Sequence, residues 1–262
     1  MEKLSLKNRK GQNIVGLLEK PNSEVKGTVI VLHGYGGFKE QPHIQAMKQA
    51  FMDNGFISFN FDATNTFGES DGEYEKATIG LHYEDFEDVA NWVQEQEWFQ
   101  SPLAVVGHSM GGYAVARYAE DYPNKVGLCA PIAPVVSGDL SWEAHRKAHP
   151  GELEEWKKTG WVESASASIP GVIKRQPWSH MEERLDHNLI PDAGKLTMPV
   201  FLYVGSEDDG IPPEHVQILF DAIPIGNKTL VIADGAPHTY RTEKDIQHLY
   251  HSLSEWIKKQ IN

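Results

Sequence analysis

The chain has 262 residues, of which 40% are hydrophobic, and its single cysteine excludes a disulfide framework, so we expect one large α/β domain with a buried core. The formal net charge of −13, with no compensating Lys/Arg cluster, argues against nucleic acid as a partner and favours neutral substrates. No apolar run approaches the roughly 20 residues that span a bilayer, and residues 1–6 contain no signal core, so we expect a cytoplasmic protein without membrane contact.

Short apolar runs are predicted to be strands, and most of them are separated by helical patterns. The predicted strands are residues 14–18, 28–32, 56–61, 103–106, 126–132, 200–204 and 229–232. Alternation of this kind indicates parallel strands with crossover helices. Hydrophobicity is continuous in residues 29–32 and 201–204, which predicts strands covered on both faces.

The predicted helices lie on both faces of a central sheet. They are residues 42–54, 82–96, 110–121, 213–222 and 242–259, the last of them an amphipathic helix near the end of the sequence. The only cysteine, Cys129, falls in an apolar strand and is predicted to be a packed thiol.

Residues 138–195 break this rhythm and contain no strand-like run. We expect them to form an inserted helical cap, called the cap segment below, while residues 1–137 and 196–262 form the core. Active sites in open α/β sheets lie at the carboxyl ends of strands, where this insert begins. Residues 163–168 are predicted to be a flexible link. Some large side chains of the cap segment either line a substrate cleft or pack the cap onto the core: Trp142, Trp161, Trp178 and Met181.

The most informative motif is Gly-x-Ser-x-Gly, with Ser109 between a predicted strand and a predicted helix. A strand that turns at once into a helix leaves room only for tiny residues, here Gly107 and Gly111. The turn would expose the Ser109 hydroxyl over the end of the sheet. This predicts a nucleophile elbow.

A serine nucleophile needs a base and an orienting acid, and both follow strands later in the chain. His238 lies in a loop of small residues after the last predicted strand. The preceding strand is followed by Glu207, Asp208 and Asp209, of which Asp208 is preferred and Asp209 is the alternative. The order Ser109, Asp208, His238 is that of α/β hydrolases.

The turn after residues 28–32 is rich in glycine, and the backbone N–H groups of Tyr35 and Met110 are predicted to form an oxyanion hole. His33 and His108 lie in these turns, where we expect structural roles or substrate contact. Phosphate-binding glycine patterns are absent, as are metal-ligand spacings, so no cofactor and no metal are expected.

With these motifs in place, the chain resembles the α/β-hydrolase superfamily over essentially its whole length. The stretch 61–72 also resembles a loop of its serine esterases and lipases, written F-D-x-x-G-x-G-x-S-x-G, from which the chain departs at Asn65 and Thr66. The resemblance implies an α/β-hydrolase fold and is strongest to small bacterial carboxylesterases of the cinnamoyl/feruloyl-esterase type.

We therefore predict a serine carboxylesterase that hydrolyses small to medium acyl or aryl esters through an acyl-enzyme, with a small-molecule ester as its partner and a monomer or homodimer as its state. The alternatives are a thioesterase or small-peptide hydrolase, and a non-catalytic binding member of the fold. A basic rim would favour a coenzyme A thioester; the cap segment holds Lys157, Lys158, Lys174 and Arg175 but is also rich in Glu, so the sequence leaves this open.

Overall fold

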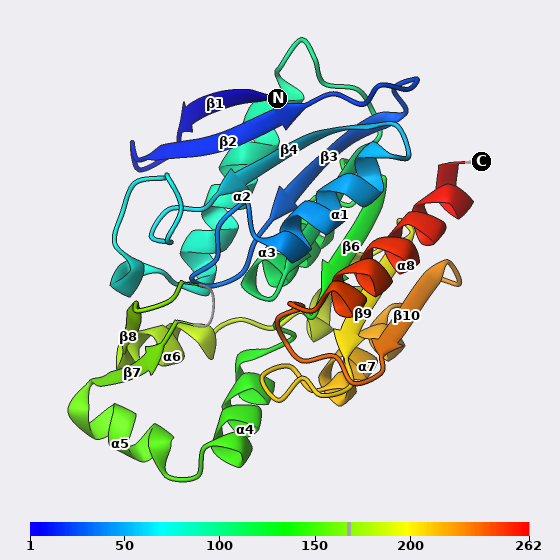
Figure 1. The fold of residues 1–262 in the computed structure, drawn as a ribbon. Coiled ribbons are helices and arrows are strands. Elements are labelled where there is room, and N and C mark those ends of the chain that lie inside the picture. Colours follow the sequence, from blue (N-terminus) through cyan, green and yellow to red (C-terminus); the bar gives the residue numbers. More distant parts are fainter. Residues whose placement is uncertain (167–168, 262) are drawn as a thin grey trace.

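A computed structural model describes residues 1–166 and 169–261 of the chain. Its centre is an eight-stranded sheet in the order β1-β2-β4-β3-β5-β6-β9-β10 (Figure 1). The strands are β1 (Glu2–Lys7), β2 (Asn13–Glu19), β3 (Gly27–Leu32), β4 (Phe56–Asp62), β5 (Leu103–His108), β6 (Leu128–Ile132), β9 (Val200–Gly205) and β10 (Lys228–Ala233). β2 is antiparallel to β1 and β4, and the other neighbours pair in parallel.

Helices cover both faces of the sheet. One face carries α1 (Pro42–Met52) and α8 (Glu243–Ile261), and the other carries α2 (Ile79–Gln94), α3 (Met110–Asp121) and α7 (Pro213–Ala222) (Figure 1). Because side chains alternate along a strand, Val29 and Val31 pack with α1 and α8, while Ile30 and Leu32 pack with α2 and α3. The predicted α/β fold, a mostly parallel sheet between helices, is confirmed.

The sequence analysis missed one strand of this sheet. β1 forms the edge beside β2, and its pattern of alternating polar and apolar residues leaves most of it exposed. A single half-covered strand has only two apolar positions, Leu4 and Leu6, which give a weak signal.

The cap segment lies beyond the carboxyl ends of the parallel strands (Figure 1). It contains α4 (Gly138–Ala148), α5 (Glu152–Thr159), β7 (Trp161–Ala165), β8 (Ile173–Pro177), α6 (Trp178–Arg184) and the short 3₁₀ helix η2 (Ile190–Lys195); a second 3₁₀ turn, η1 (Tyr74–Lys76), belongs to the core. The expectation that the helical cap contains no strand is wrong, because β7 and β8 form an antiparallel hairpin beside its helices. β7 is largely exposed and β8 is half-buried with mostly polar residues, so neither carries an apolar periodicity.

The predicted flexible link at 163–168 is also wrong in its first half, since residues 163–165 belong to β7. Residues 167 and 168 lie outside the described residues. The division of the chain into a core and a cap at 137 and 196 stays a prediction.

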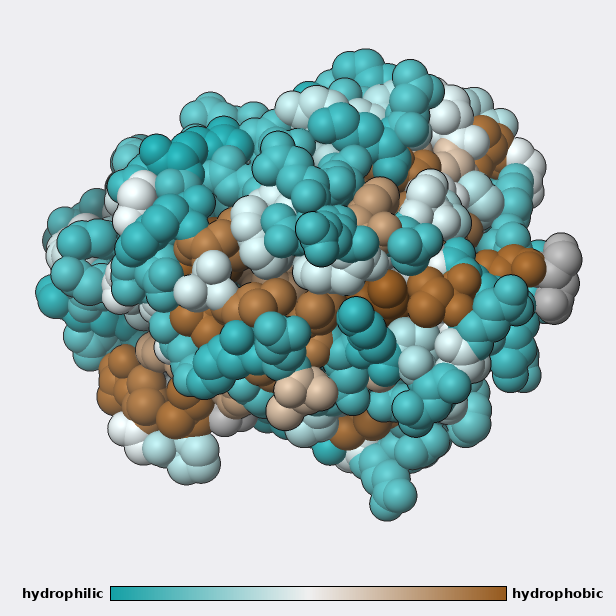
Figure 2. Space-filling model, turned by 90° about the horizontal axis from the view of Figure 1, so that it is seen from above, coloured by the Kyte–Doolittle hydropathy of each residue, from teal (hydrophilic) through white to brown (hydrophobic). Residues whose placement is uncertain are grey.

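The face seen from above is mostly hydrophilic, with its hydrophobic groups in a broken band between hydrophilic ones (Figure 2). Among the helices of the described residues, none has the length and apolar character needed to cross a membrane.

Candidate active site

Ser109 occupies a strained turn between β5 and α3. Its φ and ψ of 58° and −116° lie outside the conformations that side chains prefer. A Cβ on Gly107 would lie 2.3 Å from the Gly111 carbonyl oxygen, and one on Gly111 would lie 2.4 Å from that of His33. Glycine is therefore required on both sides of Ser109, as the elbow motif predicted.

His238 and Asp208 come from the loops after β10 and β9. The Nε2 atom of His238 lies 3.0 Å from the Ser109 hydroxyl oxygen, and its Nδ1–H donates to Asp208 Oδ2 at 2.7 Å. The other carboxylate oxygen of Asp208 accepts from the backbone N–H of Ile211 at 2.7 Å, which fixes its orientation. Asp208 is buried, whereas the alternative acid, Asp209, is exposed. The structure thus brings Ser109, His238 and Asp208 together and leaves Asp209 outside.

Tyr35 and Met110 both border the cavity beside Ser109. Met110 is the first residue of α3, and the first N–H groups of a helix have no acceptor within it. The turn that carries Tyr35 is closed by a bond from Gly37 N–H to the Gly34 carbonyl at 3.0 Å. These positions are compatible with the predicted oxyanion hole, whose role stays a prediction.

His33 holds this turn from inside the core. Its Nδ1–H donates to the Gly34 carbonyl at 2.8 Å, and its Nε2 accepts from the Ala63 N–H at 3.2 Å. Burial lowers its pKa from the ordinary value, which favours this neutral form. His33 is fully buried and does not border the cavity.

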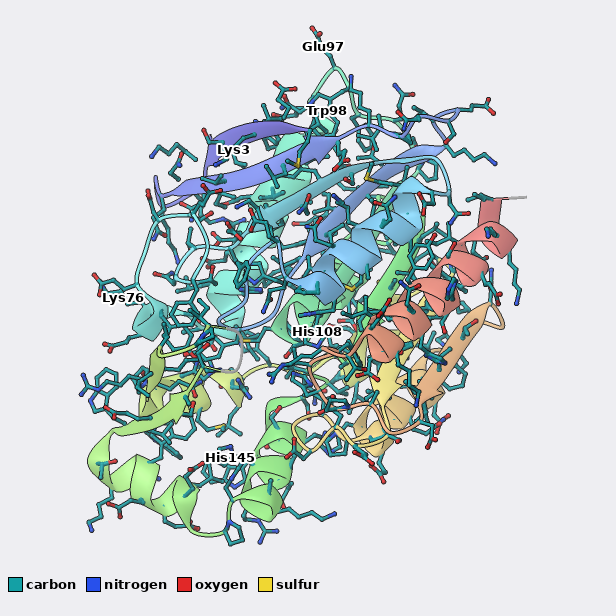
Figure 3. The ribbon with its side chains drawn as sticks, in the orientation of Figure 1. Lys3, Lys76, Glu97, Trp98, His108 and His145 are labelled. Carbon is teal, nitrogen blue, oxygen red and sulfur yellow. The ribbon has the colours of Figure 1, made fainter. Side chains whose placement is uncertain are left out.

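His108 lies at the end of β5, where the sheet meets the cap segment, whereas His145 lies farther out on α4 (Figure 3). The Nε2–H of His108 donates to the backbone carbonyl of His238 at 2.9 Å and so positions the loop that carries the proposed base. Burial, together with neighbouring His43 and His238, lowers the pKa of His108 well below its ordinary value, and burial also lowers that of His43 to about 3. Both rings are therefore neutral neighbours of His238.

The cavity beside Ser109 has a volume of about 220 Å³. Its lining residues include Ser109, His238, Tyr35, Met110 and His108, and also some that the motif analysis did not place there: Gln41, His43, Val135, Lys174, Arg184, Ile211 and Thr239. The cap segment contributes Lys174 and Arg184. Neither belongs to a recognisable motif, and only the basic rim considered for coenzyme A pointed to Lys174.

The four large side chains of the cap segment that were candidates for substrate contact lie away from the cavity beside Ser109. Trp178 and Met181 are buried in a small apolar cluster against which Trp142 packs. Trp161 is exposed and stacks under Arg175, whose guanidinium carbon lies 3.9 Å from the ring centre. None of these four side chains lines the cavity beside Ser109.

Asn65, at which the loop departs from the family pattern, is buried. Asn65 adopts a positive φ of 60°, which asparagine tolerates better than most residues. Its side-chain oxygen accepts from the N–H of Glu73 at 3.1 Å. The substitution for glycine therefore has a local structural solution that does not involve Ser109.

Side-chain groups that could hold a metal were sought among the described ranges, 1–166 and 169–261. No cluster of three or more His, Cys, Asp or Glu side chains suitable for a metal ion occurs there. Cys129 is buried in β6, where burial raises the pKa of its thiol, as expected for a packed residue rather than a reactive one.

The sheet order, the elbow and the Ser-His-Asp geometry define an α/β hydrolase. The chain belongs to the Hydrolase_4 family, described as serine aminopeptidase, S33, whose model matches residues 23–164. The expected membership of the α/β-hydrolase superfamily is confirmed.

Relatives of the chain are distant in sequence, and each match covers most of both proteins. An uncharacterized 31.7 kDa protein of Escherichia coli is 25% identical over 92% of this chain and 94% of its own length. Palmitoyl-protein thioesterase ABHD10 of Bos taurus is 25% identical over 88% of this chain and 73% of its own, and a monoacylglycerol lipase of Mycolicibacterium smegmatis is 24% identical over 94% and 93%.

Solved structures share the fold. Est1E from Butyrivibrio proteoclasticus, with ferulic acid bound, superposes with a TM-score of 0.77 at 20% identity over 98% of this chain and 99% of its own. The mouse α/β-hydrolase domain-containing protein 10 gives a TM-score of 0.79 at 22% identity, with 99% of both chains covered. The resemblance to feruloyl-esterase-type members thus agrees with the structural likeness.

Proposed function

We propose that this protein is a serine carboxylic-ester hydrolase that acts on small to medium acyl or aryl esters. The observation that carries the proposal is the continuous chain from Asp208 through His238 to Ser109, with distances of 2.7 and 3.0 Å, at the edge of the cavity. Relatives named as an esterase, a lipase and a thioesterase support the same chemistry.

In the first half of the reaction, His238 takes the proton of the Ser109 hydroxyl while Oγ bonds to the ester carbonyl carbon. Asp208 holds the Nδ1–H and stabilises the imidazolium that forms. The negative charge passes to the carbonyl oxygen, where the N–H groups of Tyr35 and Met110 would donate to it. The bond to the alcohol oxygen then breaks, and His238 returns its proton to that oxygen.

In the second half, a water molecule takes the place of the alcohol. His238 removes one of its protons as the water oxygen bonds to the acyl carbon. The bond to Ser109 Oγ breaks and the serine regains its proton. The products are a carboxylic acid and an alcohol, and no cofactor is consumed.

A thioesterase is the second candidate, because ABHD10 is a relative over most of this chain. The same triad would serve, since a thioester differs only in its leaving group. A cavity of about 220 Å³ is smaller than the roughly 300–1,000 Å³ that accommodates drug-sized ligands, which favours short acyl groups. The family description also names an aminopeptidase, so an amide substrate belongs in the same test.

The test is a hydrolysis panel of p-nitrophenyl esters from butyrate to palmitate, with methyl ferulate, an acyl thioester and an aminoacyl anilide. We expect ester turnover that falls with acyl length and that drops by at least about a thousandfold in Ser109→Ala. Ser23→Ala, at an exposed loop position, is the matched control. Full activity in Ser109→Ala would disprove the triad, and turnover of the thioester or anilide alone would favour the second candidate or an amidase.

A further inference from the structure

The cap segment places two cations at the cavity beside Ser109. They are Arg184, the last residue of α6, and Lys174 on β8, called the cationic pair below. No acidic side chain is among the described residues that line this cavity. The chain as a whole has the opposite balance, with 37 acidic and 24 basic residues. The cavity is thus locally positive in an acidic protein.

The hydrogen-bond partner of the Arg184 guanidinium is a histidine ring, not a carboxylate. The Nη2–H of Arg184 donates to His180 Nε2 at 2.8 Å, while the Nδ1–H of His180 donates to the Ala77 carbonyl at 2.9 Å. Burial and the nearby guanidinium lower the pKa of His180 to about 3, so this partner is a neutral ring. The Nε atom of Arg184 is buried without a hydrogen-bond partner in the described part of the chain. An unmatched buried donor of this kind is costly unless a ligand completes it.

The carboxylate next in sequence is occupied elsewhere. Glu183 accepts from the backbone N–H groups of Gly80 and Ile79, at 2.7 and 3.1 Å, and also lies 2.8 Å from His187 Nε2. Its oxygens therefore bind the N-terminus of α2 and His187, and its charge acts on Arg184 without a direct contact. Across residues 1–166 and 169–261, Arg184 forms no ion pair with a carboxylate.

Lys174, like Arg184, forms no ion pair with a carboxylate among the described residues. It is partly buried beside the turn of Tyr35, where a Cβ on Gly36 would lie 3.5 Å from its Cδ atom. Burial, with a contribution from Arg241, lowers its pKa from the ordinary value. The adjacent Arg175 offers a contrast, because it lies within 3.6 Å of Glu163 and 3.9 Å of Glu75. Lys174 has no such partner among the residues that the structure describes.

We propose that the substrate is an ester that carries a second, anionic group, a carboxylate, which binds the cationic pair while its ester carbonyl meets Ser109. This inference rests on the proposed esterase function and narrows its substrate class. A guanidinium matches a carboxylate with two parallel hydrogen bonds, and an ammonium adds a point charge. An anionic substrate would replace the neutral substrate that the overall charge of the protein suggested.

The anion can belong to the acyl half or to the alcohol half of the ester, and matched substrates separate the two. The acyl pair is p-nitrophenyl hydrogen adipate and p-nitrophenyl hexanoate, which differ by a carboxylate in place of a terminal methyl group. The alcohol pair is p-carboxyphenyl butyrate and p-tolyl butyrate. In each case kcat/KM is measured at pH 7 after subtraction of the uncatalysed rate.

We expect the wild-type enzyme to prefer the anionic member of one pair. In Arg184→Gln, kcat/KM for that ester should fall by about 10- to 100-fold, the value of a charge-assisted hydrogen bond, while the neutral ester changes by less than about threefold. Lys174→Met should also reduce the preference for the anionic ester. Lys158→Met, an exposed cation on α5, should leave both rates unchanged.

Several outcomes would overturn the inference. One is a wild-type enzyme with the same kcat/KM for the anionic and the neutral ester of each pair. Another is that Arg184→Gln and Lys174→Met lower kcat/KM equally for both esters, as expected for a merely structural role. If Ser109-dependent turnover is equal for the anionic and the neutral member of each pair, the proposed function is retained and this substrate class is rejected. Absence of Ser109-dependent ester turnover would reject the proposed function itself.

Discussion

The turn at Ser109 leaves no room for side chains at its flanking glycines. In Gly111→Ala, the new Cβ would lie 2.4 and 2.7 Å from the carbonyl oxygens of His33 and Leu32, which are backbone atoms and cannot rotate away. We expect the variant to lose about 1–3 kcal/mol of free energy of unfolding, as for overpacked cores, and to lose ester turnover as well. Urea denaturation and the p-nitrophenyl assay measure the two effects.

Gly226→Ala is the matched control for that variant. Nothing lies within 4 Å of a Cβ at Gly226, and the residue does not require a positive φ. It should keep wild-type stability and turnover. If Gly111→Ala behaves like Gly226→Ala, close packing at the elbow does not require glycine beside Ser109.

The orienting role of Asp208 is tested by Asp208→Asn, which replaces the carboxylate with an amide of the same shape. One oxygen of Asp208 accepts from Ile211 N–H and the other from His238. In Asp208→Asn, the amide oxygen is expected to stay on Ile211, so its NH₂ group would face His238 and force the proton onto Nε2. That tautomer cannot accept the proton of Ser109, and kcat should fall by about 10³- to 10⁴-fold.

The exposed Asp209 supplies the control, because it was the alternative acid in the sequence. Asp209→Asn should stay within about twofold of wild type, as for surface sites without catalytic contacts. Equal losses in the two variants, at equal stability, would reject Asp208 as the single orienting acid.

At the level of elements, the sequence predicts those parts of the molecule where chemistry or burial restricts the residues. The Ser109 elbow, the His238 loop and the buried strands all carry such patterns, and the structure contains them. The β7–β8 hairpin contains no fully buried residue, and its half-buried positions include polar side chains such as Lys174 and Gln176, so no apolar period of two marks it. Arg184 and Lys174 reach the cavity only through the tertiary position of that hairpin and α6, which local sequence does not encode.

The contact between α6 and α2 is held by Glu183. Burial would raise the pKa of this carboxyl group, but bonds from His187 and Gly80 outweigh it and lower the pKa. Negative charge at a helix N-terminus is stabilising, and here it binds two free N–H groups of α2. Glu183→Ala should therefore lower the free energy of unfolding by about 1–3 kcal/mol at pH 7, measured in urea.

Glu182 on the same helix is exposed and gives the comparison. Glu182→Ala should be nearly neutral. Because the pKa of Glu183 is lowered, its contribution is present above the unfolded value of 4.5 and is lost as the pH falls through the folded value. A difference between the two variants that does not shrink in acid would contradict the ionic origin of the contact.

At the scale of the whole molecule, one buried acid contributes to how stability depends on pH above the range in which Glu183 acts. Glu120 on α3 is 1% exposed, and neither carboxyl oxygen has a hydrogen-bond partner among the residues described. Burial raises its pKa from 4.5 to about 8, although Arg117, at 3.5 Å, opposes the shift. Between these two pH values the folded protein binds more protons than the unfolded chain. The stability that this group contributes is complete below pH 4.5 and is lost as the pH rises through about 8.

Glu120→Gln keeps the size of the side chain and removes its ionisation. Wild type should lose up to about 5 kcal/mol of free energy of unfolding between about pH 5 and pH 8 relative to this variant, because the pKa rises from 4.5 to about 8 and each pKa unit is worth about 1.4 kcal/mol. Urea denaturation at several pH values measures the difference. Glu97→Gln, at an exposed position at the far end of the molecule from the cap segment (Figure 3), should run parallel to wild type. Parallel pH profiles for wild type and Glu120→Gln would mean that Glu120 is already ionised in the folded protein, and that Arg117 stabilises its charge more strongly than burial opposes it.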